Sequence, residues 1–67
     1  MKIKVNGGMR EISEGSTISE IFSQLDIKTT AGIALAVNNS VVSKKKWDST
    51  TIQAEDDILI IRATQGG

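Results

Sequence analysis

The sequence ends in Gly66-Gly67, and this pair has the clearest chemical meaning in the chain. Two residues without side chains can pass through a slot too narrow for other residues, and they reach backbone conformations closed to residues with a Cβ atom. The last group is then a sterically bare carboxylate, suited to activation by another protein's active site. The competing interpretation is a frayed chain end, because terminal residues are commonly poorly ordered.

The residue types in the chain exclude most chemistry of its own. There is no Cys and no His, which excludes disulfides, soft-metal sites and catalysis by a thiolate or a His base. Asp56 and Asp57 are adjacent carboxylates, but a metal site needs several oxygen ligands that converge. We therefore expect no catalytic residue, no bound cofactor and no metal, and we predict that the protein is not an enzyme.

Size and charge limit the class further. With 67 residues the chain forms one small domain with a modest core. Eight basic residues balance eight acidic ones, which argues against nucleic acid, since its binders are strongly basic. The sequence shows no long apolar run and no leader of the secretory type, so we expect no membrane span and a cytoplasmic location.

The first half of the chain predicts a hairpin and a helix. Residues 1–6 alternate apolar and polar side chains as a half-buried strand does, and Asn6-Gly7-Gly8 is a hairpin signal before a return strand at 9–13. A capping box between Thr17 and Glu20 starts the helix, which ends near Asp26. Its apolar face has the helical spacing i, i+3, i+4 and i+7: Ile18, Ile21, Phe22 and Leu25.

The second half predicts three strands. Residues 33–37 are all apolar and predict a strand covered on both faces, 41–42 a short return strand, and 58–63 the last strand. One main helix packed on one face of a mixed sheet of four to five strands is an α+β arrangement, the ubiquitin-like β-grasp, with the first and last strands parallel at its centre. Residues 1–63 form this domain, and residues 64–67 form a flexible tail.

The last strand carries more apolar residues than one covered face needs. If Ile58 and Ile60 face the helix, then Leu59 and Ile61 face away, because side chains alternate along a strand. Ala34 and Ala36 flank them in this prediction. An exposed apolar patch often marks a protein-binding surface, so we assign partner binding to Leu59 and Ile61. Arg62, close to the tail, either pairs with an acidic group of the partner or keeps the chain end soluble.

The loop before the last strand is harder to interpret. Trp47 suits an interface anchor, but packing beneath a loop is the favoured interpretation. Lys44-Lys45-Lys46 either form a solvated loop, which we favour, or meet an acidic partner.

With these features in view, the chain resembles the ThiS family, the ubiquitin-like sulfur carriers of thiamine biosynthesis. The resemblance rests on the Asn6-Gly7 hairpin, the Thr17-x-x-Glu20 helix start, the strand end Ala36-Val37-Asn38, Trp47 and the end Gln65-Gly66-Gly67. Two segments depart from the family pattern.

Glu55-Asp56-Asp57 replaces the usual Asp-Gly-Asp, so a positive φ at Asp56 would cost about 1 kcal/mol relative to Gly. Ser43-Lys44-Lys45-Lys46 stands before Trp47, where the family often has Pro-Arg.

The resemblance implies a carrier cycle performed by partners. An adenylyltransferase related to the ubiquitin activators uses ATP and Mg²⁺ to adenylate the Gly67 carboxylate. A persulfide sulfur, traced to a cysteine desulfurase, converts it to a thiocarboxylate, and thiazole synthase takes the sulfur for the thiazole ring of thiamine. Gln65 and Gly66 belong to the tail that reaches the active site.

Two alternatives remain open. One is the same chemistry in the small subunit of molybdopterin synthase, which also ends in Gly-Gly. The other is a ubiquitin-like module that only binds partners or is conjugated to lysines through Gly67.

Overall fold

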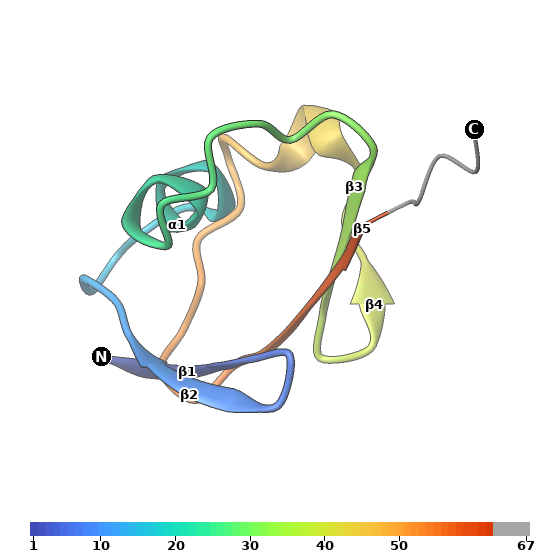
Figure 1. The fold of residues 1–67 in the computed structure, drawn as a ribbon. Helices are drawn as coiled ribbons and strands as arrows, with labels where there is room; N and C mark the ends of the chain where they lie inside the picture. The colour runs from blue at the N-terminus through green and yellow to red at the C-terminus, as the bar shows by residue number, and fades with distance from the viewer. Residues whose placement is uncertain (63–67) are drawn as a thin grey trace.

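The computed structural model describes residues 1–62. Their elements, in chain order, are β1 (Lys2–Val5), β2 (Gly8–Glu11), α1 (Ile18–Gln24), β3 (Ile33–Val37), β4 (Ser40–Val41), the short 3₁₀ helix η1 (Lys44–Lys46) and β5 (Asp57–Arg62). The strands form one sheet in the order β2-β1-β5-β3-β4. β5 lies at the centre, parallel to β1 and antiparallel to β3. The sheet curves around α1, which lies on its concave side (Figure 1). The predicted ubiquitin-like β-grasp is confirmed.

Both hairpins of the sheet turn on asparagine. Asn6 and Gly7 have φ of 50° and 86°, and Asn38 and Asn39 have φ of 51° and 71°. Two successive positive φ values define the two-residue type I′ turn, whose twist matches that of the flanking strands. Because this turn needs only Asn6 and Gly7, Gly8 belongs to the return strand rather than to the turn.

The strand bounds differ slightly from the predicted ones. The return strand covers Gly8–Glu11 instead of 9–13, β4 covers Ser40–Val41 instead of 41–42, and β5 begins one residue earlier, at Asp57. The tight turns determine the first two differences, since pairing resumes immediately after the second turn residue.

The start of α1 is the predicted capping box. The Thr17 hydroxyl accepts from the backbone N–H of Glu20 at 3.3 Å, and the Glu20 carboxylate accepts from the backbone N–H of Thr17 at 2.8 Å. The helix ends at Gln24, and Asp26 beyond it takes a φ of 61°. Ile18, Ile21 and Phe22 are buried, as the apolar spacing predicts.

The core lies between α1 and the concave face of the sheet. Its buried members are Ile3, Ile12, Ile18, Ile21, Phe22, Ile33, Leu35, Trp47, Ile52 and Ile58. Trp47 closes one side of it: the ring lies 4.9 Å from that of Phe22, centroid to centroid, and its Nε1–H donates to the Val42 carbonyl at 2.9 Å. The favoured interpretation of Trp47 as a packed residue agrees with this position.

The prediction that residues 33–37 are covered on both faces is wrong. Ala34 is exposed, because among the described residues a helix covers only the concave face of the sheet. Ala36 is buried for a different reason. It is directly paired with Leu59 on one side and with Val41 on the other, and these larger side chains rise from the same face and cover its methyl group.

The positive φ near the last turn falls at Glu55, at 68°, and not at Asp56. Asp56 instead uses its carboxylate: Oδ1 accepts from Asn38 Nδ2 at 3.0 Å, and Oδ2 accepts from the Gln53 backbone N–H at 2.8 Å. The departure from Asp-Gly-Asp therefore strains one residue and supplies two hydrogen bonds at the next.

We expect Glu55→Gly to raise the free energy of unfolding by about 0.5 to 1 kcal/mol. A left-handed conformation costs a residue with a Cβ atom roughly 1–2 kcal/mol, and the greater chain entropy of Gly returns part of that gain. Denaturant unfolding measures the change. Asp56→Gly is the matched control, expected to lose about 1–2 kcal/mol with its two hydrogen bonds. Stabilisation by the control instead would contradict the assignment.

Candidate functional site

The predicted site has two parts, a chain end and a docking face. Gln65, Gly66 and Gly67 lie outside the described residues. The structure does describe the strand that leads to them, β5, as far as Arg62.

Leu59 and Ile61 lie on the convex face of the sheet, away from α1. Their side chains are 48% and 47% exposed, whereas Ile58 between β1 and β3 is fully buried. The register places Ile61 directly beside Ala34, and it places Leu59 in a row with Ala36 and Val41. The two rows form one apolar surface across β5, β3 and β4. We call Leu59, Ile61, Ala34 and Val41 the open-face patch.

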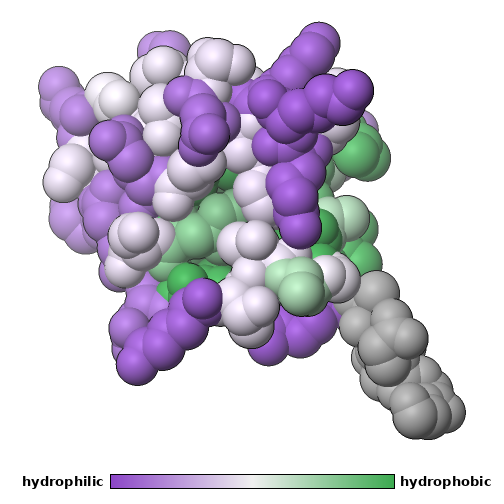
Figure 2. All heavy atoms as spheres, turned by 90° about the horizontal axis from the view of Figure 1, so that it is seen from above, coloured by the Kyte–Doolittle hydropathy of each residue, from purple (hydrophilic) through white to green (hydrophobic). Residues whose placement is uncertain are grey.

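The patch holds most of the exposed apolar bulk of the described chain. Among residues 1–62 the large hydrophobic side chains that are exposed are Met9, Val41, Leu59 and Ile61. Three of these four belong to the patch. Figure 2 views the molecule from above, where hydrophobic surface shows only in a central strip and along one flank, among polar and charged side chains. Val41, at 75%, is the most exposed of the four, and sequence reasoning missed its role because the two-residue strand is too short to show alternation.

Arg62 does not share this face. It pairs with Ile33, a core residue, so its side chain leaves the sheet on the side opposite to Leu59 and Ile61. The structure therefore brings two of the three predicted partner-binding residues together and places the third at the end of the same strand, on the other face. The strand alternation used to separate Leu59 from Ile58 also predicts this separation.

A shallow hollow adjoins the patch beside Leu59. It measures about 430 Å³ and is lined by Lys4, Asn6, Gly7, Asn39, Asp57 and Leu59. Both type I′ turns contribute to it, so its rim is polar and its shape depends on the two hairpins. It gives the apolar patch a polar border with one basic and one acidic side chain.

The two turn asparagines also hold β5. Asn6 Oδ1 accepts from the Ile60 N–H at 2.7 Å, and Asn6 Nδ2 donates to the Ile60 carbonyl at 3.3 Å. Asn38 Oδ1 accepts from the Asp57 N–H at 2.9 Å, and the Asn38 N–H donates to the Asp57 carbonyl at 2.8 Å. Asn38 thus holds the start of β5, and Asn6 holds its second half. The sequence predicts the turns but not these contacts, which join residues far apart in the chain.

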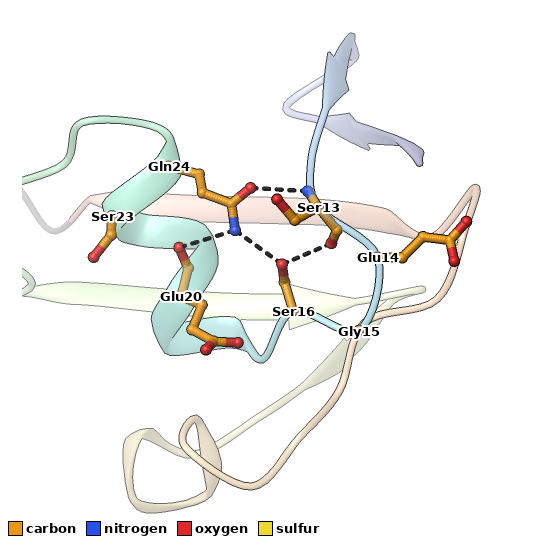
Figure 3. A pocket seen from close by; sticks show the side chains of 7 residues that line it. All are labelled: Ser13, Glu14, Gly15, Ser16, Glu20, Ser23 and Gln24. Atoms are coloured by element: carbon orange, nitrogen blue, oxygen red, sulfur yellow. Dashed lines mark hydrogen bonds between the residues drawn. The ribbon is translucent and has the colours of Figure 1, made fainter.

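A second hollow, of about 460 Å³, lies between residues 13–16 and one side of α1 (Figure 3). Hydrogen bonds join three of the residues that line it, Ser13, Ser16 and Gln24. Gln24 Oε1 accepts from the Ser13 N–H at 2.9 Å, Gln24 Nε2 donates to Ser16 Oγ at 2.8 Å, and Ser16 Oγ donates to the Ser13 carbonyl at 2.7 Å. The network holds the segment that connects β2 to α1. No residue of β5 lines this hollow.

The lysine run forms η1, which the sequence does not predict. Lys44 Nζ donates to the Thr30 carbonyl at 3.0 Å and lies 5.6 Å from the centroid of the Trp47 ring. Lys44 therefore makes two contacts with the fold, although its side chain is exposed, as are those of Lys45 and Lys46.

No group of three or more His, Cys, Asp or Glu side chains within residues 1–62 is arranged to hold a metal ion. None of the helices in this range has the length and apolar character that a membrane crossing requires.

Comparison with known proteins gives consistent matches. The model of the ThiS family matches residues 3–67. The chain is 34% identical over 67 residues to the sulfur carrier protein ThiS of Escherichia coli (strain K12), covering 100% of both chains.

Among solved structures, it superposes on the crystal structure of the thiamine biosynthesis protein ThiS from Geobacter metallireducens with a TM-score of 0.86 and 23% identity, covering 100% of both chains. A solution structure of a thiamine biosynthesis protein from the same organism gives 0.80 and 23%, covering 88% of that chain. At this identity the two structures support the fold.

Proposed function

The chain belongs to the ThiS family, and we propose that it carries sulfur, as a thiocarboxylate on Gly67, for the thiazole ring of thiamine. The observation that carries the proposal is the family match, which runs to the terminal Gly66-Gly67 pair. The 34% identity to the sulfur carrier of Escherichia coli over all 67 residues supports the same reaction class.

The chemistry follows from the reactivity of a carboxylate. A carboxylate is a poor acyl electrophile, because its oxygen is a poor leaving group. Attack of a Gly67 oxygen on the α-phosphorus of ATP releases pyrophosphate and turns that oxygen into part of a good leaving group, AMP. A persulfide sulfur then displaces AMP, and cleavage of the S–S bond by a thiol leaves the thiocarboxylate. This group holds sulfur covalently and is a soft nucleophile.

Other proteins perform these steps. A ubiquitin-activating-type adenylyltransferase binds ATP and Mg²⁺ and adenylates the chain end, a desulfurase supplies the sulfur indirectly, and thiazole synthase consumes it. This chain provides the acyl group and the surface that partners recognise, so it is a carrier and not an enzyme. We expect the cycle to run in the cytoplasm, where the partner has ATP available.

The open-face patch is the proposed docking surface for these partners. Leu59 and Ile61 lie on β5, the strand that continues to Gly67. Gly67 is five residues beyond Arg62, a length that spans at most about 18 Å when extended. A partner bound to the patch therefore has Gly67 within reach of a nearby active site. Arg62, on the other face of the strand, can pair with an acidic group of the partner beside the active site.

The mass of the intact protein, isolated from cells that make thiamine, tests the proposal. We expect a fraction in which one oxygen is replaced by sulfur, and we expect this fraction to vanish when the activating enzyme is absent. Adducts joined to lysines through Gly67 would identify a protein modifier instead. A single unmodified mass, together with no adenylation by a ThiS-family activating enzyme, would leave only a binding module.

A further inference from the structure

The side chain of Asn6 extends the sheet where β1 stops. Backbone pairing between β1 and β5 ends at Val5 and Ile58, and the Asn6 N–H donates to the Ile58 carbonyl at 2.9 Å. At the next step along β5, the Asn6 amide takes over from the backbone. It accepts from the Ile60 N–H at 2.7 Å and donates to the Ile60 carbonyl at 3.3 Å. A side-chain amide has the same donor and acceptor as a peptide group, so it acts as one more rung of the ladder.

This rung is the last support of β5 on the β1 side within the described chain. Backbone groups along a strand point alternately to its two neighbours. The N–H and C=O groups of Ile58 and Ile60 therefore point to β1, and those of Leu59 and Ile61 point to β3. Pairing with β3 continues to Arg62, but the β1 side holds nothing beyond Ile60 in residues 1–62. Without Asn6, β5 is supported on a single side from Leu59 onward.

We infer that Asn6 is a positioning residue, which fixes the path of β5 through Ile60 and so presents Ile61 and the route to Gly67 together in one orientation. The two hydrogen bonds with Ile60 support the role of Asn6 in holding the strand. The expected effect on partner binding rests on the proposed function. A partner that binds the open-face patch must find the chain end at a set distance and direction. If Ile60 to Arg62 change direction, Ile61 and the route to Gly67 no longer fit the partner together, so the complex forms less readily while the chemistry of the bound chain is unchanged.

Asn38 is a matched control for Asn6 within the same chain. It also stands first in a type I′ turn, with φ of 51° against 50° for Asn6, and it also accepts from a β5 N–H. Its contact is with Asp57, at the start of the strand, far from the end that leads to Gly67. The two residues therefore share turn geometry and type of contact, and differ in the part of β5 that they hold.

The test compares Asn6→Gly with Asn38→Gly. Gly accepts positive φ readily, so both turns survive and only the side-chain contacts are removed. We expect Asn6→Gly to speed amide hydrogen exchange at Ile60 roughly tenfold, in line with the net strength of a hydrogen bond. Asn38→Gly should speed exchange at Asp57 and leave Ile60 unchanged.

The second readout is kinetic, with the adenylyltransferase that loads the wild-type chain. We expect Asn6→Gly to raise KM roughly tenfold with kcat within about twofold, because docking in the correct orientation is lost while the reacting carboxylate is unaltered. Asn38→Gly should leave KM unchanged. Asn6→Asp keeps an acceptor for the Ile60 N–H but no donor, and we expect intermediate values.

Equal Ile60 exchange in Asn6→Gly and wild type would overturn the inference, and so would an unchanged KM. A role for Asn6 in the turn alone predicts both of these results. If the wild-type chain is not adenylated, the proposed function fails, and the exchange measurement still decides whether Asn6 holds the strand.

Discussion

Removing Gly67 is expected to abolish sulfur loading and to leave the domain folded. The sheet and the core that the structure describes lie within residues 1–62, so we expect the free energy of unfolding to stay within about 0.5 kcal/mol of wild type. The shortened chain still ends in a carboxylate, but that group is withdrawn by one residue, roughly 3.3–3.6 Å. A misplacement of about 1 Å can already cost a hundredfold in rate. Loading, measured as the fraction that gains sulfur in an assay with the activating enzyme, should fall by at least a hundredfold.

A chain extended by one alanine after Gly67 is the matched control. It retains both glycines but moves the carboxylate outward and gives it a neighbouring methyl group. We expect the same loss of loading. Substantial loading of either variant would refute Gly67 as the site of the chemistry, and would favour a function in which the domain acts by binding alone.

The second large effect is expected for Leu59→Asp. The side chain is about half exposed, so the substitution should lower the free energy of unfolding by only about 1 kcal/mol, chiefly through the low strand propensity of Asp. In a docked complex the same carboxylate would be buried against an apolar partner surface without a counter-charge, which costs several kcal/mol. We expect KM for adenylation to rise by about a hundredfold.

Met9→Asp separates docking from general surface effects. Met9 is 56% exposed and pairs with Lys4, so it lies on the same convex face as Leu59. It is outside the open-face patch, on the edge strand β2. We expect normal loading and a similar small loss of stability. If both variants bind the activating enzyme equally well, the patch is not the docking surface, and unfolding by Leu59→Asp alone would show that its role is structural.

Local signals in the sequence predicted the elements well. The capping box from Thr17 to Glu20 and the turn at Asn6-Gly7 depend on residues a few positions apart, so their physics is contained in a short segment. The alternation of Ile58 and Leu59 correctly separated the buried face of β5 from the exposed one, because the period of a strand is fixed at two.

The contacts that were not predicted depend on the assembled sheet. The sequence predicts that Ala36 flanks Leu59, but it does not predict that Val41, from a third strand, covers the other side of Ala36. The grip of Asn6 on Ile60 joins residues 54 positions apart. Likewise, the positive φ lies at Glu55, while Asp56 bonds with Asn38 and Gln53. The sequence pattern does not show which of these two adjacent turn residues takes the positive φ.

The central position of β5 affects how the protein is made. Its partner β1 is the first strand of the chain, and the register joins Lys4 to Asp57, so the middle of the sheet cannot form until almost all of the chain has left the ribosome. A product whose translation stops before β5 lacks the central strand, so its apolar residues have no complete core in which to be buried and are prone to aggregation. Every folded molecule has therefore been translated at least as far as the strand that leads to its glycines.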